Sequence, residues 1–155
     1  MKTVEIELNG KHFEASVEPR CSLADLIREQ AGLTGTHLGC EHGVCGSCTV
    51  LLDEQPVRSC ITLALSVEGA NVRTIEGFDD DETMQRLRAA FSEAHGLQCG
   101  FCTSGMLISC RDLVLRCPDA SREELRRGLS GNICRCTGYA GIIDALELAL
   151  TKDRP

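Results

Sequence analysis

The sequence predicts an α+β protein in which a small mixed β-sheet precedes a group of helices. In the first half, apolar and polar residues alternate, as in strands that bury one face. From residue 79 onward, apolar residues recur every three or four positions, as in helices. Two sets of four cysteines also fall one in each half. We therefore expect two domains, residues 1–76 and 77–155.

The chain begins with a predicted β-hairpin. Apolar and polar residues alternate over 4–8 and again over 13–17. Between them lies Asn9-Gly10, a dipeptide typical of two-residue turns. Ser22 then provides an N-cap for a helix that extends to Gln30.

A glycine-rich loop over 32–46 follows this helix. The apolar stretch 48–52 is predicted to be a strand, and 53–56 a turn. A short helix over 59–67 and a final strand over 72–75 complete the first half. The predicted fold is a small mixed sheet with one helix across it.

Four helices are expected in the second half, which has no strand pattern. The first begins at the acidic run 79–82, which suits the positive end of a helix dipole. The second covers 105–116 and ends before Pro118. The third begins at the capping box Ser121-x-x-Glu124, and the fourth covers 142–150.

The composition excludes several classes of protein. The formal charge of −7 over 155 residues argues against binding nucleic acid or an anionic membrane. No apolar run is long enough for a membrane span. The N-terminus lacks a secretory or twin-arginine signal, so we expect a cytoplasmic protein. Eleven cysteines, an odd number, in such a protein indicate metal ligation rather than disulfides.

The first cysteine set has the spacing C-x4-C-x2-C-x11-C. It begins like the plant-type ferredoxin pattern for a [2Fe–2S] cluster. Three interleaved glycines, Gly39, Gly43 and Gly46, are expected to let the backbone curl and point N–H groups at sulfur. Zinc is a weaker alternative. The pattern also lacks the histidine pair of a Rieske centre, so His42 is expected to be an ordinary loop residue. The predicted ligands are Cys40, Cys45, Cys48 and Cys60.

The second cysteine set has the spacing C-x2-C-x31-C-x-C. Each pair directly precedes a predicted helix, where backbone N–H groups favour thiolates. The spacing alone does not name the metal, and zinc stays open. The predicted ligands are Cys99, Cys102, Cys134 and Cys136. Of the remaining cysteines, Cys110 is expected to be a buried apolar residue, and no function is assigned to Cys21 or Cys117.

Together, the motifs resemble the small iron–sulfur subunit of the molybdenum hydroxylase (xanthine dehydrogenase) family. The resemblance rests on the segments 35–40, 45–50, 98–103 and 132–139 and covers essentially the whole chain. It implies a β-grasp, ferredoxin-like domain followed by an all-α four-helix domain, each with one [2Fe–2S] cluster. One departure is Ser104, where many family members have proline.

The resemblance also implies a role for Gln98 and Cys136. In the family, the glutamine before the first cysteine and one cysteine of the C-x-C pair approach the pterin of the molybdenum cofactor. A primary amide can both donate to and accept from a pterin edge. Without the resemblance, Gln98 would be taken for an ordinary surface residue.

The function implied is that of an electron-transfer subunit. Electrons from a molybdopterin centre, in its cytosine dinucleotide form, on a large subunit would pass through both clusters to FAD on a medium subunit. The expected assembly is a dimer of heterotrimers. The alternatives are a free-standing two-cluster electron carrier and a zinc-structured interaction module. No catalytic residue is expected on this chain.

Overall fold

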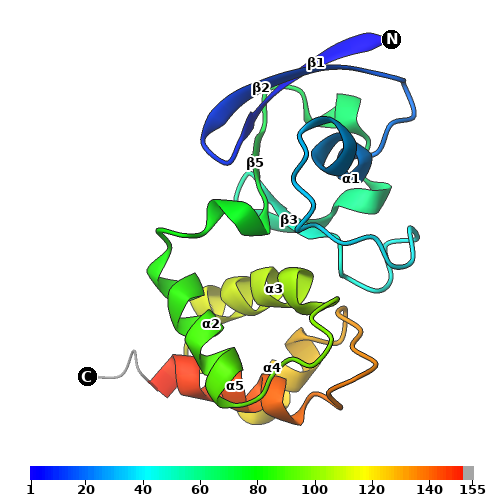
Figure 1. The fold of residues 1–155 in the computed structure, drawn as a ribbon. Helices are drawn as coiled ribbons and strands as arrows, with labels where there is room; N and C mark the ends of the chain where they lie inside the picture. The colour runs from blue at the N-terminus through cyan, green and yellow to red at the C-terminus, as the bar shows by residue number, and fades with distance from the viewer. Residues whose placement is uncertain (152–155) are drawn as a thin grey trace.

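The protein consists of a sheet-based half and a helical half (Figure 1). The computed structural model describes residues 1–151. In Figure 1 the sheet and its crossing helix lie above, and α2 to α5 lie below. The predicted α+β class is confirmed.

The sheet has five strands in the order β2-β1-β5-β3-β4. β1 and β5 run parallel, and the other neighbouring pairs are antiparallel. The predicted N-terminal hairpin is confirmed, with Asn9 and Gly10 at φ 51° and 75° in its turn. The strands are β1 (Lys2–Leu8), β2 (Lys11–Val17), β3 (Thr49–Leu52), β4 (Gln55–Arg58) and β5 (Asn71–Arg73).

Strand β4 corrects the predicted turn over 53–56. The turn is confined to Asp53 and Glu54, both at positive φ, and β4 begins at Gln55. Pro56 was taken as a turn signal, but it lies on the edge strand of the sheet. A proline is tolerated there because an edge strand need not donate every N–H.

The helix across the sheet is α1 (Leu23–Asp25) continued by a π-helical turn over Leu26–Gln30. Ser22 caps it as predicted, since its side chain accepts from the Asp25 N–H. The predicted helix over 59–67 is instead two short 3₁₀ turns. Between them, Leu63 forms a β-bridge with Ser22. The core under α1 contains Val4, Ile6, Leu8, Val17, Leu23, Leu26, Ile27, Val50, Ala64, Val67 and Val72.

All four helices predicted for the second half are present. Asp81 caps α2 by accepting from the Met84 N–H, and the capping box of Ser121 and Glu124 is complete. None of the helices within residues 1–151 is long and apolar enough to cross a membrane. The helices are α2 (Glu82–Glu93), α3 (Thr103–Arg116), α4 (Arg122–Gly128) and α5 (Ala140–Thr151).

The two halves share buried residues at their junction. Leu51 of β3 belongs to the helical core, and α3 packs against β3 and β4. Phe78 is fully buried, with the guanidinium of Arg73 4.1 Å from its ring centre. Arg111 of α3 donates to Asp81 at 2.9 and 2.7 Å. The boundary between residues 76 and 77 stays a prediction, and residues 152–155 of the second predicted domain lie outside the described chain.

Gly105 allows the closest approach between the two halves. It lies in the first turns of α3, where glycine is a poor helix former. A Cβ atom at this position would overlap the carbonyl oxygens of Gly46 and Ser47 in the first cysteine loop. The helix can therefore pack on this loop only with glycine at 105.

Gly105→Ala should lower the free energy of unfolding by about 1–3 kcal/mol, because backbone atoms must move apart. For a chain of this length that is a fall of several degrees in melting temperature. Anaerobic thermal unfolding measures it. The matched control is Gly128→Ala in α4, where the added methyl meets only the flexible Leu113 side chain. Equal effects of the two substitutions would contradict the packing argument.

Candidate iron–sulfur sites

The first predicted set of cysteines comes together beside the sheet. Cys40 and Cys45 lie in the glycine-rich loop, Cys48 directly precedes β3, and Cys60 lies in the 3₁₀ turn after β4. The sulfur of Cys40 interacts with that of Cys45, and Cys60 interacts with Cys48 and Cys40. All eleven cysteines lie in the described chain, and none of them forms a disulfide.

The glycines of this loop serve the predicted purposes. Gly43 and Gly46 have φ of 77° and 79°, a backbone conformation that residues other than glycine rarely adopt. Gly39 allows close approach instead, since a Cβ there would lie 3.1 Å from the Cys45 sulfur. The N–H groups of His42 and Cys45 donate to the Cys40 sulfur at 3.3 and 3.4 Å, as the glycine pattern predicted.

These N–H groups favour a thiolate at Cys40. The N–H donors of Cys45 and His42 lower the pKa of the Cys40 thiol to about 6. Burial and the neighbouring Cys48 raise the pKa of the Cys60 thiol to about 11. Iron binds thiolates, so the lowered pKa of Cys40 suits its predicted role as an iron ligand. N–H groups that stabilise a thiolate also stabilise the added negative charge of a reduced cluster.

The second set of cysteines assembles between the starts of two helices, as predicted. Cys99 and Cys102 directly precede α3, with Cys102 as its N-cap, and Cys134 and Cys136 precede α5. The sulfurs of Cys136 and Cys99 are 3.5 Å apart. Cys102 interacts with Cys134 and Cys99, so all four sulfurs share one site.

The loop carrying Cys134 is held by polar contacts that the sequence did not predict. The Thr137 hydroxyl donates to the Cys134 sulfur at 3.1 Å. The Tyr139 hydroxyl accepts from the Cys134 N–H at 2.8 Å and donates to the Asn132 carbonyl at 3.0 Å. Tyr139 is the only tyrosine in the chain, and its place directly after the C-x-C-T-G motif was the available signal.

The thiols of the second site differ in acidity. Burial is the main cause that raises the pKa of the Cys102 thiol to about 12, and the neighbouring Cys134 and Cys99 also raise it. The backbone N–H of Cys102 lowers this pKa but does not outweigh them. Burial also acts on Cys134, but the hydroxyl and N–H of Thr137 outweigh it and lower the Cys134 pKa. The site thus combines a buried sulfur with one that accepts hydrogen bonds, and both features tune the potential of a bound cluster.

The two cysteine loops touch each other directly. The Ile133 N–H, next to Cys134, donates to the carbonyl of Cys45 at 2.8 Å. The Asn132 side chain donates to the Gly46 carbonyl at 3.3 Å. Arg58 of β4 donates to the Gly131 carbonyl and to the Thr49 hydroxyl, both at 2.6 Å. The sequence did not predict these contacts.

The other predicted residues are also placed by the structure. Gln98 and Cys136 are exposed, and the Gln98 amide makes no hydrogen bond to any part of the described chain. Cys110 is fully buried in the helical core, as predicted. Cys21 and Cys117 are half-buried and far in sequence from the ligand sets.

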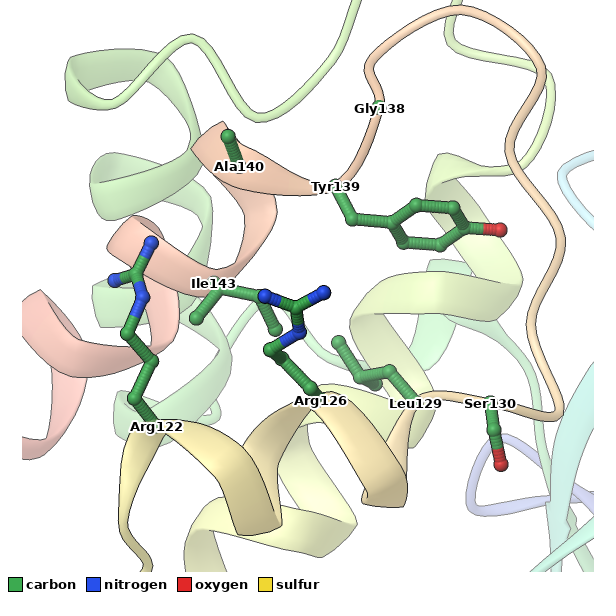
Figure 2. Close-up of a pocket in the computed structure, with 8 residues that line it drawn as sticks. All are labelled: Arg122, Arg126, Leu129, Ser130, Gly138, Tyr139, Ala140 and Ile143. Atoms are coloured by element: carbon green, nitrogen blue, oxygen red, sulfur yellow. The ribbon is translucent and has the colours of Figure 1, made fainter.

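A pocket of 290 Å³ lies between α4 and the start of α5 (Figure 2). The side chains of Arg122 and Arg126 extend toward Ala140 and the start of α5. Arg122 is already paired with Asp144 at 2.8 Å and with Glu147. No cysteine lines this pocket, so the two cysteine sites are the candidate functional sites.

Comparison with protein families finds two matching domain models. Residues 6–74 match a 2Fe-2S iron-sulfur cluster binding domain, and residues 74–147 match a [2Fe-2S] binding domain. The chain is 46% identical over 147 residues to the caffeine dehydrogenase subunit gamma of Pseudomonas sp. (strain CBB1), covering 93% of this chain and 88% of the relative. It is 47% identical over 143 residues to the nicotine 6-hydroxylase small subunit of Paenarthrobacter nicotinovorans, covering 92% and 86%.

The solved structures agree with this result. The crystal structure of quinoline 2-oxidoreductase from Pseudomonas putida 86 matches with a TM-score of 0.91 and 49% identity, covering 97% of this chain and 94% of that one. The chain belongs to the small iron–sulfur subunits of the molybdenum hydroxylase family. As such it carries electrons for an oxidoreductase and has two [2Fe–2S] clusters. The zinc alternatives and the free-standing carrier have no support among these relatives.

Cys134→Ser should remove the second cluster and leave the first. The two ligand sets are separate, and only one of them contains residue 134. Iron analysis and the electron paramagnetic resonance (EPR) spectrum of the reduced protein measure this. Two irons should be lost with one EPR signal. Loss of both signals would contradict separate sites.

Ser104→Pro should stabilise the protein by about 0.4–1 kcal/mol. The Ser104 hydroxyl is buried without a hydrogen-bond partner in the described chain, and residue 104 lies in the first turn of α3. Proline removes this hydroxyl and restricts the unfolded chain. A rise of a few degrees in melting temperature with unchanged iron content is expected. A lower melting temperature would show that the helix start needs serine.

Proposed function

We propose that this subunit relays electrons from a molybdopterin centre on a large subunit to FAD on a medium subunit. The observation that carries the proposal is the direct contact of the two cysteine loops through Ile133 and Cys45. This contact supports two ligand sets in series, which a relay needs and two unrelated metal sites do not. The molybdopterin centre, when bound in the complex, supplies the two-electron oxidation of the substrate.

The ligand assignment forms part of the proposal. The four-sulfur sets fit [2Fe–2S] clusters because each supplies four thiols around one site together with N–H donors to sulfur. The first cluster would be held by Cys40, Cys45, Cys48 and Cys60. The second would be held by Cys99, Cys102, Cys134 and Cys136.

The second site is the proposed point of entry for electrons. Gln98 and Cys136 are both exposed beside it, and the Gln98 amide is free to bond a partner. An amide that donates and accepts matches a pterin edge. We therefore assign Gln98 and Cys136 as the contacts to the molybdopterin cytosine dinucleotide of the large subunit.

The first site would then pass electrons to the medium subunit. Its loop exposes Val44 and, next to Cys60, Ile61, at 60% and 63% of their surface. The Ile61 side chain lies against Gly43, the residue before Val44, so the two exposed side chains are neighbours, and contiguous apolar patches are typical of surfaces that bind another protein. The proposed assembly is a dimer of heterotrimers in the cytoplasm, with the substrate site on the large subunit.

Co-purification from the native host tests this function. A tagged chain should bring down a large and a medium subunit, with molybdenum and flavin in the preparation. A lone brown protein that contains iron but neither of the other cofactors would contradict the proposal and favour a free-standing carrier.

Gln98→Ala should slow electron transfer from the substrate without loss of either cluster. The lost hydrogen bond is worth about 0.5–1.5 kcal/mol, or about two- to tenfold in rate or in cofactor retention. Turnover and molybdenum content of the complex measure this. The matched control is Gln55→Ala, the same change on the exposed edge strand. Wild-type turnover and molybdenum content in the Gln98 variant would show that the assigned contact is wrong.

A further inference from the structure

His37 of the first half is joined to Phe101 of the second half by two contacts. The His37 Nδ1 lies 2.7 Å from the Phe101 carbonyl oxygen. Because a carbonyl can only accept, Nδ1 carries the hydrogen and donates it. The two rings also stack, with centres 4.9 Å apart and planes at 22°. Neither residue is a predicted ligand.

The surrounding backbone is shaped for this contact. Gly39, two residues after His37, has no side chain, and a Cβ there would lie 3.4 Å from the Phe101 ring. Gly100 precedes Phe101 at φ 80°, so the turn that presents the Phe101 carbonyl needs a left-handed residue. The turn at Gly100 thus positions the Phe101 carbonyl for this contact, and Gly39 adds no side chain beside the Phe101 ring.

The position of the accepting carbonyl gives the contact a chemical consequence. The Phe101 carbonyl and the Cys102 N–H belong to the same peptide group. A hydrogen bond to the carbonyl polarises this group and makes the N–H a stronger donor. That N–H belongs to Cys102, the N-cap of α3 and a proposed ligand of the second cluster. Stronger donors near cluster sulfurs stabilise the reduced cluster and set its potential.

We propose that His37 is a positioning residue which tunes the second cluster from the first half of the chain. Its hydrogen bond to the Phe101 carbonyl raises the reduction potential of the second cluster relative to the first. The equilibrium sharing of electrons between the clusters is thereby set partly by a side chain that contacts neither ligand set. The inference rests on the proposed ligand assignment.

Three variants separate the hydrogen bond from the stacking. His37→Phe keeps an aromatic ring on Phe101 and removes the donor. His37→Asn keeps a donor at the position of Nδ1 and removes the ring. The control is His12→Phe, the same substitution on the exposed strand β2. Each is measured as the purified complex with both clusters, by EPR-monitored redox titration at one pH.

Removal of the donor should lower the midpoint potential of the second cluster. In His37→Phe the equilibrium constant for electron exchange should shift toward the first cluster by up to about twofold, because polarisation of the peptide group passes on only about 10–30% of the value of one hydrogen bond. His37→Asn and His12→Phe should stay close to wild type. The signal of the second cluster is identified as the one that Cys134→Ser removes.

Three results would overturn the proposal. The first is a wild-type second-cluster potential in His37→Phe. The second is an equal shift in His37→Phe and His37→Asn, which would show that the ring matters and the donor does not. The third is loss of the second cluster from His37→Phe, which would give the contact a role in assembly. Failure of the ligand assignment is distinguishable, since Cys134→Ser would then leave both [2Fe–2S] signals in place.

Discussion

The hydrogen bond from the Ile133 N–H to the Cys45 carbonyl is the contact on which the rest of the structure depends. It joins the residue before one proposed ligand to the carbonyl of another across the two halves of the chain. The bond requires that the two loops meet without intervening side chains. Glycine at 46 and 105 makes this possible, because a Cβ at either position would collide with the facing loop. Arg58 then donates to the Gly131 carbonyl, and Asn132 donates to the buried Gly46 carbonyl.

This constraint connects the fold to its function. A carrier of electrons needs thiolates, donors to sulfur and a fixed relation between its clusters, and it needs no substrate pocket. The loops supply the donors through backbone N–H groups of His42, Cys45 and Thr137. The helices contribute rigidity, since each pair of the second set directly precedes the start of a long helix. Residues that hold the loops together therefore affect electron transfer without touching iron.

The sequence predicted the elements that depend on short segments, and it missed the contacts between residues far apart in the chain. Both cysteine sets, the four helices and the N-terminal hairpin follow from spacing, capping and turn chemistry within short segments. Strand β4 was missed because Pro56 is a turn signal unless the strand is known to lie on an edge. His37, Arg58 and Asn132 contact partners more than 60 positions away. Contacts of this kind leave no periodic pattern, so only the folded chain shows them.

The spin–spin interaction between the two clusters tests the central claim most directly. The proposed ligand sets lie in loops that contact each other directly. The low-temperature EPR spectrum of the fully reduced wild-type protein should therefore show two [2Fe–2S] signals split by their mutual interaction. In Cys134→Ser the remaining signal should lose that splitting. Two unsplit signals in the wild type, each the same with or without the other cluster, would contradict the account.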